Sequence, residues 1–441
     1  MKSSTSFVCQ ECGYDSPAYL GKCPECGEWN SIKEIKTGPI NSSSRKTARE
    51  ASNINPKTLK EIKYDVKERL LTSFSEMDGV LGGGIVHGSV ILLAGDPGIG
   101  KSTLLLQLAM GVSKKNKVLY VSGEESEQQI KIRANRLKTT HNASDLLILS
   151  STSTDVVVSV IAEVKPDLVI IDSIQTMESE NLPGLSGSVS QVRYSTSEFI
   201  KLAKTLNIPI IIVGHVTKEG MVAGPMILSH MVDTVLFLEG EKITTMRILR
   251  SFKNRFGPVD EVGVFTMDSE GMKEVGNPEQ IFLSGAKNNR APGSSIVATL
   301  EGTRAFLVEI QALVVFSKLP MPRRVALGID SRRLELLIAV LQKHCRLPLD
   351  TMDVFVNVAG GLRLSDPASD LGICLAIFSS FKNIPISKIV GIAEVGLLGE
   401  LRKAGNLEKR VKEAKKLGFS DIITAEKYKF LNDVLTNYGK N

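Results

Sequence analysis

The sequence predicts an α/β protein whose core is a mainly parallel β-sheet covered by helices on both faces. Two observations predict it. Short, almost continuous apolar runs alternate with amphipathic helical patterns between residues 90 and 214. A glycine-rich phosphate-binding motif joins the first of these runs to the first helix. Strands buried on both faces have this apolar character, whereas a strand with one solvated face alternates apolar and polar residues.

The predicted strands are short apolar runs that end at polar residues. They are VILLAG (90–95), VLYVSG (118–123), LLILS (146–150), LVIID (168–172) and PIIIVG (209–214). Apolar residues at helical spacing predict the helices between them, at residues 102–115, 126–138, 154–165 and 197–207. The carboxyl ends of parallel strands meet at one edge of a sheet, so we expect a ligand site there.

Length and composition limit the class of protein. The chain has 441 residues, which predicts about three domains of roughly 150 residues. Hydrophobic residues make up 42% and charged residues 23%, which excludes wholesale disorder and a collagen-like fibre. The net charge of +6 does not by itself indicate nucleic-acid binding. No apolar run is long enough to span a membrane and the first residues lack a signal-peptide core, so we expect a cytoplasmic protein.

Four of the six cysteines lie in the first 26 residues, and they form two CxxC pairs. They are Cys9, Cys12, Cys23 and Cys26. Two such turns supply four thiolates, which suit a closed tetrahedral Zn²⁺ site of structural type. The alternative is a pair of redox motifs. Residues 1–30 are therefore predicted to be a zinc-binding knuckle that unfolds when the metal is lost.

Residues 31–60 are polar, rich in serine and without apolar periodicity. They carry seven basic and two acidic side chains. We interpret them as a flexible basic linker, either a plain solvated tether or a weak arm for phosphate groups. Residues 61–275 are predicted to form the ATPase domain, and residues 276–441 a separate C-terminal domain.

The first strand runs directly into the complete motif GxxxxGK[ST]. The expected nucleotide-binding residues are Gly95, Asp96, Pro97, Gly98, Ile99, Gly100, Lys101, Ser102 and Thr103. Backbone N–H groups of such a loop wrap around phosphates at the start of a helix. Lys101 is expected to reach the β- and γ-phosphates of ATP, and Ser102 to ligate Mg²⁺.

Polar residues follow the other strand ends. Asp172 fits the role of holding Mg²⁺ through water, with a strand-exit cap as the alternative. Glu124 is expected to deprotonate the attacking water, and Glu125 is the second candidate for that role. His215 is either a sensor of the γ-phosphate or an ordinary polar residue at a strand end.

The residues around the phosphate-binding motif carry a family resemblance. The stretch from LTSFSEMDGV to GKSTLLLQ (71–107) resembles a RecA-type core, and residues 253–257 read KNRFG. With the four N-terminal cysteines, this chain resembles the RadA (Sms) family of bacterial DNA-repair proteins along nearly its whole length. KNRFG is the signature of that family, and it is intact here.

The resemblance implies an ATP-hydrolysing, ring-shaped motor on single-stranded DNA, with helicase or branch-migration activity, within the nucleoid. It implies a homo-oligomer of hexameric form, RecA recombinase as a partner, and branched recombination intermediates as substrates. ATP lies between subunits in such rings, so by analogy Lys253 and Arg255 would act on the nucleotide of a neighbouring subunit. The alternatives are a nucleotide-dependent assembly switch without motor activity, or an ATP-dependent protease.

Two glycine-containing stretches after strands are candidate DNA loops, at residues 177–195 and 216–230. Loops in these places line the DNA channel of RecA-like rings. Arg193 and Lys218 are the basic candidates for phosphate contact, and ordinary surface loops are the alternative. Aromatic residues make up only 5% of the chain, which favours contacts to the DNA backbone over base stacking.

The last third resembles the proteolytic domain of Lon, an α+β domain that RadA proteins carry at this end. Lon uses a Ser–Lys dyad, in which lysine activates serine. The matching positions here hold Ala368 and Glu408, while Ser369 and Lys409 lie one residue out of register. We therefore expect a catalytically inactive domain that is not a peptidase. Cys345 and Cys374 lie on apolar helical patterns and are expected in the core.

Overall fold

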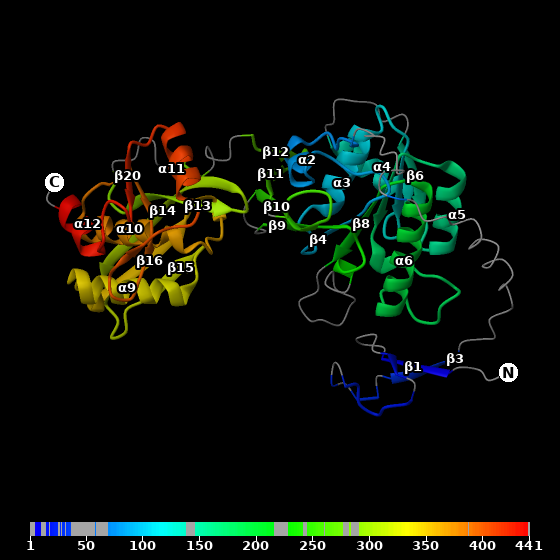
Figure 1. The fold of residues 1–441 in the computed structure, drawn as a ribbon, viewed down its shortest axis with the longest axis horizontal. Helices are drawn as coiled ribbons and strands as arrows, with labels where there is room; N and C mark the ends of the chain where they lie inside the picture. Colours follow the sequence, from blue (N-terminus) through cyan, green and yellow to red (C-terminus); the bar gives the residue numbers. More distant parts are fainter. Residues whose placement is uncertain are drawn as a thin grey trace. The chain divides into compact units, whose positions relative to one another are not determined.

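A computed structural model describes most of the chain (Figure 1). The described residues are 5–9, 15–16, 18–24, 27, 29–30, 32–36, 58, 69–137, 146–215, 228–240, 245–259, 261–276, 282–283, 291–386 and 388–439. The chain divides into two compact units. The first comprises residues 1–238, 251–257 and 269–271, and the second comprises 239–250, 258–268 and 272–441. Residues 239–250 and 258–268 thus group with the C-terminal part, although they precede the boundary expected at 275/276.

The first unit is organised around a mainly parallel sheet. The order of its strands is β12-β11-β10-β9-β4-β8-β7-β5-β6. The parallel strands are β4 (Val90–Gly95), β5 (Val118–Ser122), β6 (Leu146–Ser150), β7 (Leu168–Asp172), β8 (Ile210–His215) and β9 (Thr234–Glu239). The same sheet also includes β10 (Met246–Asn254), β11 (Val262–Asp268) and β12 (Gly271–Glu274), most of whose residues group with the second unit. The predicted α/β class with a parallel sheet is confirmed.

The helices follow the strands in the expected alternation. They are α2 (Ser75–Val80), α3 (Lys101–Val112), α4 (Glu127–Arg136), α5 (Thr154–Val164) and α6 (Val189–Leu206), with a 3-10 turn η1 (Ile174–Thr176). The expectation of a loop over 177–195 is wrong for residues 189–195, because α6 begins at Val189. Val189, Val192 and Phe199 are buried on one face of α6, and this apolar face stabilises the helix's first turns.

Both faces of the parallel sheet are buried at β4, β5, β7 and β8, whereas the edge strand β6 is partly exposed. Leu92, Val121, Ile171 and Ile212 pack in one cluster with Phe199 of α6. The residues between them along the strands point to the opposite face, because successive side chains of a strand alternate. There Leu93 and Tyr120 are fully buried as well. This two-sided burial explains why the strands have almost no polar residues before their carboxyl ends.

The N-terminal segment contains a small antiparallel sheet in the order β2-β1-β3. Its strands are β1 (Thr5–Cys9), β2 (Asp15–Ser16) and β3 (Ile32–Lys36). Cys9 and Cys23 are each only 1% exposed and pack with Ile32. A sheet this small has little apolar core of its own.

The second unit contains a six-stranded mixed sheet in the order β15-β16-β14-β13-β17-β20. These strands are β13 (Ser294–Glu301), β14 (Arg304–Phe316), β15 (Arg324–Leu327), β16 (Met352–Val358), β17 (Ile389–Ile392) and β20 (Asp421–Thr424). A short hairpin joins β18 (Glu394–Val395) to β19 (Leu401–Arg402). The helices are α9 (Ser331–Cys345), α10 (Asp370–Lys382), α11 (Leu407–Lys416) and α12 (Leu431–Tyr438). The predicted α+β class of this part is confirmed.

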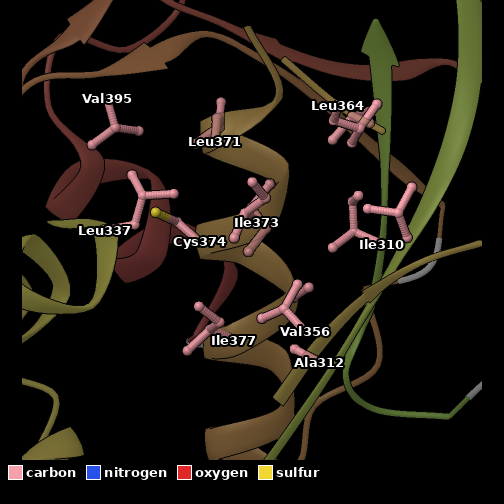
Figure 2. Close-up of a cluster of buried hydrophobic side chains, with 14 of the residues drawn as sticks. Ile310, Ala312, Leu337, Val356, Leu364, Leu371, Ile373, Cys374, Ile377 and Val395 are labelled. Carbon is pink, nitrogen blue, oxygen red and sulfur yellow. The ribbon is translucent and has the colours of Figure 1, made fainter. Parts of the chain in front are cut away.

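The core of the second unit lies around α10. Figure 2 shows Cys374 on this helix among Leu337, Ile377 and Val395. Cys374 is fully buried, and burial raises the pKa of its thiol well above the usual value. Burial also raises the pKa of Cys345 to about 11. Both thiols are therefore uncharged packing groups at neutral pH, as the sequence predicts.

None of the helices in the described part of the chain is long and apolar enough to cross a lipid bilayer.

Candidate nucleotide site

The phosphate-binding loop has the backbone that its glycines allow. Gly95, Gly98 and Gly100 adopt positive φ angles of 153°, 78° and 113°. A Cβ atom on Gly95 would lie 2.4 Å from the carbonyl oxygen of Leu238, so no larger residue fits there. Gly100 caps the start of α3 without a side-chain hydrogen bond. The first N–H groups of α3 are thus not bound by a capping side chain, which suits phosphate oxygens.

Lys101 folds back onto this loop. Its Nζ donates to the carbonyl oxygens of Gly95 at 2.8 Å and Asp96 at 3.0 Å. The side chain is only 3% exposed, and this burial lowers the pKa of Lys101 to about 8, although the charges of Asp172, Asp96 and Glu124 oppose the shift. The loop's carbonyl oxygens thus hold the Lys101 ammonium beside the loop. Phosphate oxygens of a bound nucleotide could replace these carbonyls as its hydrogen-bond partners. Ser102 and Thr103 follow in the first turn of α3.

Asp172 ends β7 beside β5, and its carboxylate has a defined partner. The Tyr120 hydroxyl lies 2.5 Å from Oδ2 of Asp172. Both residues are buried, with Asp172 6% exposed. Burial and the Asp172 charge raise the pKa of Tyr120 well above its usual value. Asp172 therefore stays near Lys101 as a hydrogen-bonded carboxylate, a group that suits the water shell of Mg²⁺.

The two glutamates after β5 have different surroundings. Glu124 Oε1 accepts a hydrogen bond from Ser173 at 2.7 Å and lies 3.6 Å from His215 Nε2. Glu125 instead pairs with Arg133 of α4 at 3.0 Å. Glu124 is therefore the carboxylate that shares its surroundings with Lys101 and Asp172, while Glu125 is turned toward a cation. This arrangement favours Glu124 over Glu125 as the general base.

His215 ends β8 next to Glu124. Burial and the charge of Lys101 lower the pKa of His215, and Glu124 and Asp172 oppose that shift. Its Nδ1 is buried and without a hydrogen-bond partner among the described residues. The imidazole is therefore neutral at pH 7, lies beside the predicted base and is close enough to the predicted phosphate-binding lysine to be affected by its charge. Its role as a sensor stays a prediction.

Lys253, the first residue of KNRFG, is held by the backbone. Its Nζ donates to the carbonyl oxygens of Ser229 at 2.7 Å and Val232 at 2.8 Å. Burial and the neighbouring Arg255 lower the pKa of Lys253, while Asp233 raises it. The ammonium is thus fixed at the segment that leads into β9.

Arg255 is anchored beside the same segment but remains 58% exposed. Its guanidinium lies 3.5 Å from Oδ1 of Asp233, and its backbone N–H donates to the Asp233 carbonyl. Asp233 is 5% exposed and also binds Lys204 Nζ at 2.6 Å and the backbone N–H of Val90 at 3.0 Å. Arg255 therefore lies at the amino-terminal end of β4.

The KNRFG segment and the phosphate-binding loop lie at opposite ends of one strand. Val90 begins β4 and Gly95 ends it, and β9 runs parallel with Ile91 opposite Thr234 and Gly95 opposite Leu238. Five residues of extended strand separate the two ends by about 17 Å. Lys253 and Arg255 thus lie at the opposite edge of the sheet from the phosphate-binding loop of this chain.

The rest of the KNRFG segment is braced against the loop of Gly82 and Leu81. Asn254 Nδ2 donates to the Leu81 carbonyl at 3.3 Å, and Arg69 donates to the carbonyls of Leu81 and Phe256. A Cβ atom on Gly257 would lie 2.9 Å from Asn254 and 3.2 Å from Gly82. The glycine therefore permits this close approach of two backbone segments.

The predicted DNA contacts are only partly described. Arg193 is exposed on α6, not on a loop as expected. Lys218 lies outside the described residues. The assignment of either residue to DNA stays a prediction.

The predicted zinc site is also described in part. Cys9 and Cys23, one from each CxxC pair, are buried in one cluster. Gly27 follows the second pair with a φ of 77°, and its N–H donates to the Cys23 carbonyl at 2.9 Å. Cys12 and Cys26 lie outside the described residues. Two buried thiols in one cluster, one of them at the start of a tight turn, fit a thiolate-bound zinc ion.

The turn that matches the Lon nucleophile holds no reactive hydroxyl at that position. Ala368 is 2% exposed, and the neighbouring Ser369 donates its hydroxyl to the Asp366 carbonyl at 2.6 Å. Glu408 is exposed on α11. Arg410, two residues further, is buried and lies 2.5 Å from Oδ2 of Asp366. An arginine–carboxylate pair thus occupies this part of the domain.

Sequence reasoning gave no role to several residues that the structure places beside the predicted site. Tyr120 and Ser173 bind the two predicted catalytic carboxylates, and Asp233 binds Arg255. Tyr120 could have been noticed in the sequence, because it carries a hydroxyl within an otherwise apolar strand. Asp233 gave none, because its partners are far away in the sequence.

Two family models match the chain. One describes an AAA domain and matches residues 55–221. The other describes a rubredoxin metal-binding domain and matches residues 7–34. These matches cover the predicted nucleotide and zinc sites.

Several relatives match over nearly the full length of the chain. The chain is 49% identical to "DNA repair protein RadA" of Bacillus subtilis, covering 96% of this chain and 92% of that protein. It is 48% identical to the protein of the same name from Halalkalibacterium halodurans, with 97% and 93% covered. Among solved structures, the RadB recombinase is 22% identical, with a TM-score of 0.38, covering 47% of this chain and 99% of that one.

Proposed function

Because the chain belongs to the RadA family of DNA repair proteins, we propose that it is an ATP-hydrolysing motor on single-stranded DNA that works in repair and recombination. The single observation that carries the proposal is the convergence of Lys101, Glu124 and Asp172 at one edge of the sheet, next to the phosphate-binding loop. An AAA domain matches this region. Phosphate binding, a metal ligand and a base are the parts that ATP hydrolysis requires.

In this proposal each of these groups has one role in hydrolysis. The loop and Lys101 bind the β- and γ-phosphates, and Lys101 exchanges the carbonyls of Gly95 and Asp96 for phosphate oxygens. Ser102 and Asp172 would hold Mg²⁺, which would neutralise charge on the phosphates. Glu124 accepts a proton from the attacking water, while Ser173 fixes its carboxylate. His215 would respond to the γ-phosphate, and its position beside Glu124 supports this role.

The remaining charge on the phosphates is neutralised from a second subunit. Arg255 and Lys253 lie at the opposite end of β4 from their own phosphate-binding loop. A head-to-tail assembly brings that end to the nucleotide of a neighbour. This supports a homo-oligomeric ring, a hexamer by the resemblance to RecA-type proteins, with ATP at each interface.

The substrates and partners rest on the family relationship. They are single-stranded DNA, branched recombination intermediates and RecA recombinase, with branch migration as the activity. The N-terminal cysteines bind structural zinc, and the C-terminal domain serves as a scaffold and not as a peptidase. Arg193 and Lys218 are the candidates for DNA contact.

The experiment measures ATP hydrolysis with and without single-stranded DNA, and branch migration on forked DNA with and without RecA. We expect DNA to stimulate hydrolysis and the full chain to move a branch. Lys101→Ala is expected to abolish both activities. A rate of ATP hydrolysis that does not change with DNA, together with no branch migration, would contradict the proposal of a DNA motor. Nucleotide-dependent assembly without turnover would favour the assembly switch, and casein cleavage would favour a protease.

A further inference from the structure

Tyr120 lies in the middle of β5 with a fully buried side chain. It is opposite Ile170 of the parallel strand β7, so Asp172 is one diagonal step away on the same face. The hydroxyl of Tyr120 lies 2.5 Å from Oδ2 of Asp172. A buried tyrosine thus contacts the carboxylate that is proposed to hold the metal.

The direction of this hydrogen bond follows from a second contact. Arg133 Nη2 lies 3.2 Å from the Tyr120 hydroxyl oxygen. A guanidinium can only donate, so the tyrosine oxygen accepts from Arg133. The single hydroxyl proton is then directed to Asp172. The carboxylate is therefore an acceptor whose Oδ2 is committed to Tyr120.

Arg133 is itself held in place. Its Nη1 lies 3.0 Å from Glu125, and its side chain is 15% exposed. A continuous chain of contacts therefore connects Glu125, Arg133, Tyr120 and Asp172. It joins α4 to the carboxyl end of β7.

We infer that Tyr120 is a positioning residue that holds Asp172 in the orientation for Mg²⁺ and keeps it from Lys101. This inference rests on the proposed function. Asp172 is the carboxylate with the largest effect on Lys101. Without the Tyr120 hydroxyl, Asp172 is free to turn toward that ammonium. The resulting ion pair would occupy both the metal ligand and the phosphate-binding lysine.

The test is Tyr120→Phe, which removes the hydroxyl and keeps the ring. The full chain is titrated with Mg²⁺ at a fixed concentration of a fluorescent, non-hydrolysable ATP analogue, and hydrolysis of ATP is followed in parallel. A hydrogen bond to a charged group predicts that half-saturation by Mg²⁺ rises about tenfold. Binding of the analogue without Mg²⁺ should weaken as well, because the ion pair with Asp172 would occupy Lys101, and saturating Mg²⁺ should restore it.

Tyr438→Phe is the matched control, since the Tyr438 hydroxyl also binds an aspartate, Asp421, at 2.8 Å in the second unit. It should leave the Mg²⁺ dependence unchanged. Arg133→Gln should also raise the Mg²⁺ concentration needed for half-saturation. The double variant should need little more Mg²⁺ than Tyr120→Phe alone. If Tyr120→Phe fails to fold, Arg133→Gln carries the test alone.

Unchanged Mg²⁺ dependence in both Tyr120→Phe and Arg133→Gln would overturn the inference. If the wild-type protein still hydrolyses ATP in that case, the proposed function is not affected. A loss of analogue binding that Mg²⁺ cannot restore would overturn it too, since that outcome indicates a purely structural role. Wild-type protein that neither binds nor hydrolyses nucleotide in a Mg²⁺-dependent way would instead contradict the proposed function itself.

Discussion

The guanidinium of Arg255 lies 3.5 Å from Oδ1 of the buried Asp233. The other oxygen of that carboxylate accepts from the backbone N–H of Val90, the first residue of β4. Asp233 therefore fixes Arg255 to the end of the strand that is farthest from the phosphate-binding loop. On the proposed assignment, a residue so placed can complete an ATP site only on another subunit.

Arg255→Ala should reduce ATP turnover without weakening ATP binding, because Arg255 does not touch its own nucleotide. Mixing Arg255→Ala protein with Lys101→Ala protein should restore hydrolysis. In random head-to-tail assemblies about a quarter of the interfaces combine two intact halves. The measurement is turnover against mixing ratio. Each variant alone is the control, and mixtures that stay inactive would count against action between subunits.

Glu124→Gln and Glu125→Gln should separate the two candidate bases. Loss of the general base in Glu124→Gln should slow single-turnover hydrolysis roughly 100- to 10,000-fold. Glu125→Gln should have a much smaller effect on the chemical step, because Glu125 pairs with Arg133. Nucleotide affinity, measured by equilibrium titration, serves as the control for both. A larger loss of hydrolysis in Glu125→Gln would reverse the assignment.

The lowered pKa of Lys101, about 8, predicts that nucleotide binding takes up a proton in alkaline solution. At about pH 9 the free protein has largely lost this proton, and phosphate oxygens favour its return. Calorimetry in buffers of different ionisation enthalpy should detect uptake of close to one proton there and almost none at pH 7. Lys101→Met should show no such difference. Equal uptake in that variant would assign the proton to another group.

The same shift has a consequence for stability. The folded-state pKa of Lys101 lies below its unfolded value of 10.5. Between these two values the unfolded chain binds more protons, so this residue raises the free energy of unfolding as pH increases. Below pH 8 the lysine is charged in both states, and the destabilising effect of its burial is fully present.

Removal of zinc should unfold the N-terminal segment and leave the nucleotide site intact. Among its described residues, this segment has one small buried cluster, around Cys9, Cys23 and Ile32. Cys9→Ser and Cys23→Ser should each lower the zinc content measured by a metal-sensitive dye, and should increase proteolysis before residue 69. Cys345→Ser is the matched control, because Cys345 belongs to the second unit. Full zinc content in Cys9→Ser would refute the thiolate site.

The parallel sheet and its order of elements could be predicted because their signals are local. The runs at 90–95, 146–150 and 168–172 are strands with the predicted bounds. The start of α6 differs from the prediction because serines interrupt its apolar spacing at residues 190, 195 and 197. Val189, Val192 and Phe199 carry that spacing nonetheless, and all three are buried.

The supporting contacts of the site could not be predicted, because they depend on which strands become neighbours. Tyr120 reaches Asp172 only since β5 lies beside β7. Arg255 meets Asp233 through a loop that follows β10. Neither of these two contacts can be predicted from the sequence around the residues that make it. The motif residues were visible in the sequence, whereas the residues that hold them in place required the fold.

The position of KNRFG at the far end of β4 has a consequence for regulation. On the proposed assignment, an isolated subunit can bind ATP but lacks the charges that complete hydrolysis. The rate of ATP hydrolysis per subunit would then rise with the local concentration of subunits and fall on dilution. Free molecules in a dilute pool would conserve ATP, and hydrolysis would begin only where subunits gather.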